Sequence, residues 1–186
     1  MFRRRAVTLL ATKCLPVTTK PGMKKSSFLF LLMFLISLAA SAQAQTFPWE
    51  AFKPRTVKEV VLSTTKAVRP DDSMFLATSI LETKALVTFT GESRPISKAR
   101  KNFLNWWAGM LNHPKEYADL YDTEYLYKEG EEEYWLATQK PITKYFAKEL
   151  KPNDKMILFL ISTGAYRDKG KIDGVLLVEE YQMPKQ

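Results

Sequence analysis

The sequence MILFLI, Met156–Ile161, has no polar residue at any of its six positions. A strand with one wet face would alternate apolar and polar side chains, so this run predicts a central strand covered on both faces. A second apolar stretch, VLLV at Val175–Val178, begins the last predicted strand, which becomes polar at Glu179 and Glu180. These two strands are the centre from which the rest of the fold is predicted.

A hairpin and a short helix are expected just upstream. Strands are predicted at Tyr117–Lys128 and Tyr134–Gln139, joined by the turn Glu129–Gly130. Apolar residues at helical spacing predict a helix over Pro141–Leu150, which Lys151–Asp154 ends. In the first strand, four residues are expected on one face: Tyr121, Thr123, Tyr125 and Tyr127.

The first half of the predicted domain repeats this mixture of helices and strands. Val57–Val68 fits a helical stripe, although its β-branched residues leave a strand open. Met74–Ile80 and Lys84–Thr90 are strand candidates, and Gly91 is expected to end the second. Ser97 is a predicted N-cap for a strong helix that Asn112-His113-Pro114 stops.

The predicted class is therefore α+β, with two or three helices and the order αββαββαββ. A hairpin, a short helix and two strands suit a small, partly open barrel of the oligomer-binding (OB) kind, in which a helix separates the third and fourth strands. A twisted antiparallel sheet with helices on one face fits the same pattern equally well.

The segment Lys24–Ala44 predicts export. Basic residues, an apolar run and the small-residue pattern Ala42-Gln43-Ala44 follow in the order of a secretory signal peptide. We therefore predict an upstream extension at 1–22, a signal peptide at 23–44 cleaved after Ala44, and one globular domain at 45–186, periplasmic or secreted in a bacterium. An uncleaved leader that acts as a membrane anchor is the alternative.

The leader region also changes the meaning of the composition. The chain has 28 Lys+Arg and 20 Asp+Glu, and residues 1–44 hold seven of the basic residues and none of the acidic ones. The remaining 21 basic and 20 acidic residues give 45–186 a net charge of +1, which disfavours nucleic acid as a partner. The one cysteine, Cys14, lies upstream of the cleavage site, so no disulfide or cysteine nucleophile is predicted in the domain.

Motifs for chemistry are absent from the sequence. The strings GxxxxGK[ST], GxSxG, HExxH and GxGxxG do not occur. The one histidine, His113, is interpreted as a helix-end residue, and the acidic residues around Glu129–Glu133 as a solvated hairpin turn. We predict no catalytic residue, no metal site and no cofactor.

A candidate ligand site lies in the segment Gly91–Pro95, interpreted as a loop before a helix. It brings an acid, a hydroxyl and a guanidinium together at Glu92, Ser93 and Arg94. Arg94 could hold a carboxylate or phosphate with two parallel hydrogen bonds, and a helix N-terminus attracts anions. The competing interpretation is that these charges pair with their neighbours.

Aromatic residues supply a second candidate surface. Trp106 and Trp107 lie 100° apart on a helix, so one is expected in the core and the other at its margin. An exposed tryptophan, Trp106, with Tyr121, Tyr125 and Tyr127 nearby could form a stacking platform for sugars or aromatic ligands, with core packing as the competing account.

Together these features favour a non-enzymatic binding module with a protein, peptide or saccharide ligand. The alternatives are a hydrolase that uses carboxylates of the acidic hairpin or of the Glu92/Arg94 segment, and an envelope structural protein held by an uncleaved leader.

Overall fold

The computed structural model describes residues 47–184. The predicted upstream extension and signal peptide lie outside these residues, so export and cleavage after Ala44 stay predictions. The elements, in chain order, are β1 (Lys53–Pro54), α2 (Val57–Lys66), β2 (Met74–Pro95), α3 (Lys98–Met110), the 3-10 helix η1 (Lys115–Leu120), β3 (Tyr121–Glu129), β4 (Glu132–Gln139), α4 (Lys140–Glu149), β5 (Lys155–Asp168) and β6 (Lys171–Gln182).

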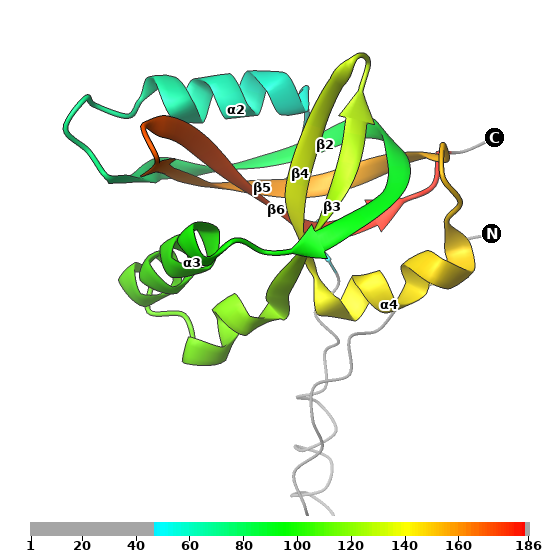
Figure 1. The fold of residues 1–186 in the computed structure, drawn as a ribbon. Helices are drawn as coiled ribbons and strands as arrows, with labels where there is room; N and C mark the ends of the chain where they lie inside the picture. Colours follow the sequence, from blue (N-terminus) through cyan, green and yellow to red (C-terminus); the bar gives the residue numbers. More distant parts are fainter. Residues whose placement is uncertain (1–46, 185–186) are drawn as a thin grey trace, which may run out of the picture. The chain divides into compact units, whose positions relative to one another are not determined.

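Five of these strands close into a barrel (Figure 1). The order is β2-β3-β4-β6-β5, and β2 pairs again with β5 to complete the circle. All pairings within the barrel are antiparallel except that of β4 with β6, and the short β1 adds a parallel pairing to β2. The predicted α+β class is confirmed. Of the two predicted forms of the sheet, an OB-like barrel and an open twisted sheet, the structure has a barrel-like one.

The barrel interior is one apolar cluster. Its walls supply alternate residues such as Val87, Leu158 and Leu176, all at most 2% exposed. Helix α2 contributes Val57 and Val60 to this cluster, whereas α4 contributes its own apolar face from the other side of the strands (Figure 1). Burial of these faces removes apolar surface from water and fixes both helices against the strands.

A second apolar cluster lies on the outside of the barrel and is called the outer wall here. Helix α3 supplies Phe103, Leu104 and Trp107, and these pack on Ala137 of β4 and Leu177 of β6. The N-cap predicted at Ser97 is confirmed, since its side chain accepts a hydrogen bond from the backbone N–H of Arg100. Trp107, at 1% exposed, is the core residue of the tryptophan pair, and Trp106 lies at the margin against Phe103.

The segment Met156–Ile161 is covered on both faces, as its composition predicts. Met156, Leu158 and Leu160 point into the barrel interior. Phe159 points outward and is still only 3% exposed, because the rings of Trp49 and Phe52 meet it edge-on. The buried position of this strand between β2 and β6 explains why no polar residue interrupts it.

Several predicted boundaries were wrong, and bulges explain most of them. The two strands expected between Met74 and Thr90 are one strand, β2, because the break between Leu76 and Leu81 is a register shift and not a turn. Gly91 does not end this strand. It adopts φ +85° within a second register shift, and β2 continues to Pro95, so the segment predicted as a loop is strand.

Two further predictions are corrected near the hairpins. The strand expected from Tyr117 begins at Tyr121, because Lys115–Leu120 forms a 3-10 helix after Pro114. The loop expected at Tyr166–Gly170 is shorter, since β5 extends to Asp168. Between α2 and α3 the structure therefore has one strand, β2, where two were predicted.

Candidate functional site

Arg94 lies at the end of β2, where the strand passes β3. Its Nε donates to Glu124 Oε2 at 2.6 Å, and its guanidinium carbon lies 4.1 Å from the centre of the Trp135 ring on β4. The side chain is 47% exposed, and among the described residues its two terminal nitrogens have no hydrogen-bond partner. The guanidinium is therefore held by Glu124 at Nε and by the Trp135 ring at one face, while its outer edge faces solvent.

Glu124 is the buried anchor of this arrangement. It is fully buried, and its second oxygen accepts from Arg100 Nη1 on α3. Arg100, itself 5% exposed, also donates from Nη1 to the Trp135 carbonyl at 2.8 Å and from Nη2 to Asp173 Oδ2 at 2.5 Å. These contacts join α3 to the outside of β3, β4 and β6.

We call the group of Arg94, Glu124, Arg100, Asp173 and Tyr166 the arginine–carboxylate network. The Tyr166 hydroxyl ends it by donating to Asp173 at 2.7 Å. Positive and negative groups alternate along the chain of contacts, so two guanidinium charges are matched by two carboxylate charges. A buried charge is tolerated only when it is paired and hydrogen-bonded in this way.

The electrostatics of Arg100 and Tyr166 follow from this pairing. Burial opposes the charge of Arg100, but the carboxylates of Asp173 and Glu124 outweigh it and raise the pKa of the guanidinium. Burial, together with the hydrogen bond to Asp173, raises the pKa of Tyr166. Arg100 is thus a permanent cation and Tyr166 a neutral donor in the network.

The structure brings some of the predicted site residues together and separates others. Glu92 and Ser93 are exposed neighbours of Arg94 on β2, and Ser93 lies opposite Tyr125 in the strand register. The Tyr125 ring, however, packs against Phe89 and Phe146, on the other face of β3 from Glu124. Trp106 packs against Phe103 on α3.

Sequence reasoning missed the partners of Arg94, namely Glu124 and Trp135, and also Arg100 and Asp173, which continue the network beyond Glu124. The face predicted for Tyr121, Thr123, Tyr125 and Tyr127 was wrong, because a register shift between Tyr121 and Thr123 turns Tyr121 to the outer wall. The acid at Glu124, in a strand rich in tyrosine, was the available signal. A lone carboxylate there does not reveal its partner 24 residues away in α3.

A second polar cluster lies at the base of the outer wall. Glu179 of β6 accepts hydrogen bonds from the Tyr121 hydroxyl and from Gln139 Nε2, and Gln139 also donates to the Tyr121 oxygen at 2.9 Å. Burial raises the pKa of Glu179 to about 7, and the neighbouring Glu180 adds to the effect. Nearby, the His113 ring stacks on Tyr117 with 4.5 Å between ring centres.

The acidic hairpin between β3 and β4 binds the chain's own groups. Glu129 accepts from the backbone N–H groups of Val57 and Lys58 at the start of α2, at 2.9 and 3.2 Å. Glu132 pairs with Lys58, and Glu133 with Lys128. Within the part of the chain that the structure describes, no three His, Cys, Asp or Glu side chains form a group that could hold a metal.

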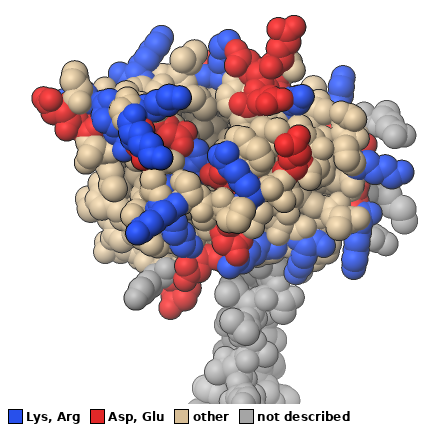
Figure 2. All heavy atoms as spheres, viewed as in Figure 1, with Lys and Arg blue, Asp and Glu red and all other residues tan. Residues whose placement is uncertain are grey.

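Charges on one face of the molecule are mixed. Figure 2 shows basic and acidic side chains interspersed over the visible face. The mixture on this face is in keeping with the net charge of +1 for residues 45–186.

Comparison with known proteins adds no relative: no family model matches the chain, and neither the curated proteins nor the solved structures contain a match. Among residues 47–184, no helix combines the length and apolar composition needed to cross a membrane.

Proposed function

We propose that this protein is an exported, non-enzymatic binding domain that holds an anionic ligand at Arg94. The observation that carries the proposal is the state of the Arg94 guanidinium, which is oriented by Glu124 and Trp135 and whose terminal donors have no partner among residues 47–184. Two parallel N–H donors on one plane match the two oxygens of a carboxylate or a phosphate.

Orientation matters because a free arginine loses rotamer freedom when it binds. Here the Nε hydrogen bond and the Trp135 ring already restrict the side chain, so less entropy is lost on association. Glu124 also keeps its own charge balanced through Arg100, so a ligand need not compete with a bare carboxylate.

The class of ligand follows from the face on which Arg94 lies. As part of this proposal we assign the barrel to the oligomer-binding kind, supported by α4, which separates the third and fourth barrel strands β4 and β5. Barrels of that kind bind oligonucleotides or oligosaccharides across their second and third strands, which here are β3 with Glu124 and β4 with Trp135. The nearly neutral charge of the domain favours the saccharide, and Arg94 favours an acidic one.

Binding to defined polysaccharides tests this proposal. Calorimetric titration of residues 45–186 with oligogalacturonate, an acidic saccharide, is expected to show saturable binding, whereas neutral dextran of the same length is expected to bind at least about tenfold more weakly. Absence of saturable binding to acidic saccharides and acidic peptides alike would contradict an anion site at Arg94. Preference for the peptide would keep the site and replace the saccharide class.

The chain offers a matched control for the arginine. Lys144 also lies over an aromatic ring, that of Tyr145, at 5.1 Å, but on α4. Arg94→Gln is expected to weaken oligogalacturonate binding about tenfold or more, whereas Lys144→Gln is expected to change it less than twofold. Equal effects of the two variants would indicate diffuse charge attraction and no defined site.

Export is the second half of the proposal. It is supported by the order of basic, apolar and small residues in Lys24–Ala44. Mass spectrometry of the protein recovered from the periplasm or the medium is expected to find Gln45 as the first residue. A peptide spanning Pro21 to Lys24 would show that translation starts upstream of Met23, and an intact leader would favour the membrane-held alternative.

The hydrolase alternative has less support from the geometry. Carboxylates of the acidic hairpin bind the start of α2 and neighbouring lysines, and Glu92 lies exposed on β2. A glycoside hydrolase of the common type needs two carboxyl groups about 5–9.5 Å apart across a cleft.

A further inference from the structure

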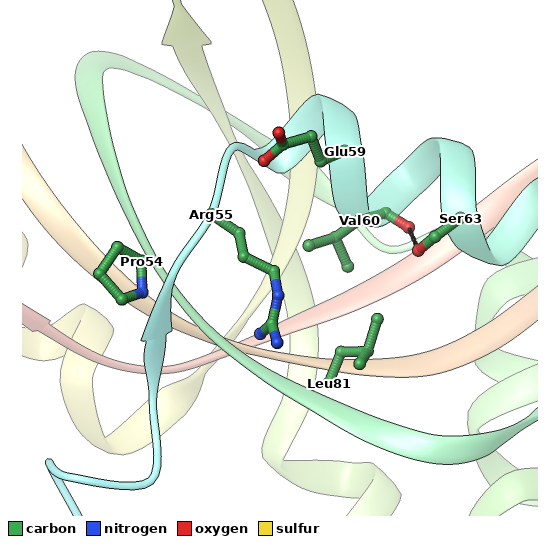
Figure 3. A pocket seen from close by; sticks show the side chains of 6 residues that line it. All are labelled: Pro54, Arg55, Glu59, Val60, Ser63 and Leu81. Atoms are coloured by element: carbon green, nitrogen blue, oxygen red, sulfur yellow. Dashed lines mark hydrogen bonds between the residues drawn. The ribbon is translucent and has the colours of Figure 1, made fainter.

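A hollow of about 410 Å³ lies beside the start of α2, and its lining shares no residue with the arginine–carboxylate network. Its lining comes from the end of β1, the first turns of α2 and the middle of β2, and consists of Pro54, Arg55, Glu59, Val60, Ser63 and Leu81. Figure 3 shows the Arg55 side chain reaching down between β1 and α2, with Val60 and Leu81 on either side of the space. The volume falls in the range of sites that bind small molecules.

Arg55 is fixed inside the hollow. Its backbone N–H donates to the Lys84 carbonyl at 3.3 Å, and its Nη1 donates to the Glu82 carbonyl at 3.0 Å. Among the described residues, its Nε and Nη2 have no hydrogen-bond partner and no carboxylate lies within ion-pair distance. The side chain therefore presents free charged donors beside two apolar side chains.

Glu59 lies outside ion-pair distance of this guanidinium. Its carboxylate completes the capping box of α2 by accepting from the Thr56 backbone N–H at 2.9 Å, and Figure 3 shows it turned away from the guanidinium. Hydrogen bonds from Thr56, with a smaller contribution from the charge of Arg55, lower the pKa of Glu59, so the rim of the hollow keeps a negative charge. A cation at the base and an anion at the rim favour a ligand with a single negative group.

From this arrangement we propose that the hollow binds a small monocarboxylate that carries an aliphatic group. The carboxylate accepts hydrogen bonds from Arg55, and the aliphatic group lies against Val60 and Leu81. Glu59 at the rim selects against dicarboxylates by repulsion. This site is separate from Arg94 and does not depend on the function proposed for it. A free fatty acid and the C-terminal carboxylate of a peptide share this chemistry.

Titration followed by NMR tests the proposal on residues 45–186 with octanoate, N-acetyl-leucine, octanol and suberate. Octanoate or N-acetyl-leucine is expected to shift the signals of Val60 and Leu81 in a saturable way, and the tighter of the two identifies the source. Octanol, without the charge, and suberate, with two charges, are expected to bind at least about tenfold more weakly. No saturable shift with either monocarboxylate, or equal binding of octanol, would overturn the proposal.

Variants separate the arginine from general charge. Arg55→Gln is expected to weaken binding of the tighter monocarboxylate about tenfold or more. Arg167→Gln is the matched control, because Arg167 also donates to backbone carbonyls, those of Arg69 and Asp72, but lies outside the hollow. The variant Arg55→Lys keeps the positive charge. Binding that survives in this variant would show that Arg55→Gln has lost the site and not the fold. Equal weakening in the Arg55→Gln and Arg167→Gln variants would overturn the assignment.

Discussion

The interior of the barrel and its outer wall are both buried, yet they are built from different chemistry. Inside, aliphatic and aromatic residues fill the space between five strands, and the buried hydroxyls of Tyr127 and Thr138 lie 3.3 Å apart. Outside, beneath α3, apolar packing is interrupted by Glu124 and Arg100, and Glu179 lies at the base of the same wall.

This difference explains how α3 and the Arg94 guanidinium are oriented. Apolar packing is non-directional, so the interior determines that the barrel closes and that α2 and α4 pack on it. Charged hydrogen bonds are directional, so the network on the outer wall determines how α3 sits and where the Arg94 guanidinium points. The site at Arg94 therefore depends on the buried ion pairs of the outer wall. Such pairs add less to stability than apolar packing, because removing charges from water is costly.

Neighbouring residues of β5 test the two apolar surroundings with the largest expected effect. Leu158 points into the barrel interior, and Phe159 points outward against Trp49 and Phe52. Leu158→Ala and Phe159→Ala are each expected to lower the free energy of unfolding by about 3–5 kcal/mol, measured by urea denaturation. A cost below about 1 kcal/mol for Phe159→Ala would show that the outer side of β5 is not a packed surface.

The network itself is tested next. Glu124→Gln leaves Arg100 buried with one carboxylate fewer, and is expected to cost about 2–4 kcal/mol of unfolding free energy. The double variant Glu124→Leu with Arg100→Met replaces both charges by apolar groups and is expected to lie within about 1–2 kcal/mol of the unmodified protein.

The same double variant sharpens the comparison between stability and orientation. It removes the hydrogen bond that holds Arg94 Nε, so it is expected to weaken ligand binding at Arg94 even where the fold is as stable as before. Unchanged binding in a stable double variant would mean that Trp135 alone orients the guanidinium.

Glu179 gives a pH-dependent test of the outer wall. Its pKa of about 7 lies above the ordinary value of 4.5, so the folded protein binds more protons than the unfolded chain between these pH values. Stability from this group is therefore fully present below about pH 4.5 and is lost as the pH rises through 7, by up to about 3 kcal/mol. Glu179→Gln is expected to flatten this dependence in urea denaturation between pH 4.5 and 8, and an unaltered profile would assign it to other groups.

The smallest effect is expected at the exposed hairpin. Lys58 and Glu132 form an ion pair at 2.8 Å, but their side chains are 57% and 55% exposed. Lys58→Ala is expected to leave the unfolding free energy, measured by urea denaturation, nearly unchanged, and any small difference is expected to shrink at high salt. A larger loss, unaffected by salt, would indicate that the lysine acts through packing on the hairpin.

The apolar pattern was enough to predict much of the scaffold. The strand at Met156–Ile161, the helices that became α3 and α4, the cap at Ser97 and the hairpin at Gly130 follow from periodicity and turn chemistry. Boundaries within β2 were wrong because a β-bulge resembles a turn in sequence while it keeps the strand paired. For the site, Arg94 was identified as a candidate, and the second candidate surface joined Trp106, which packs against Phe103, to Tyr125, which packs against Phe146.

The sequence by itself therefore determined the α+β class, the strand covered on both faces and the near neutrality of residues 45–186, because these depend on local spacing and on composition. Only the tertiary structure decided that the sheet closes into a barrel, that Glu124 meets Arg94 and Arg100, and that Arg55 faces a hollow. The reason is physical. A charged side chain has the same local pattern whether it faces water or a partner, and its partner is chosen by packing between segments distant in sequence.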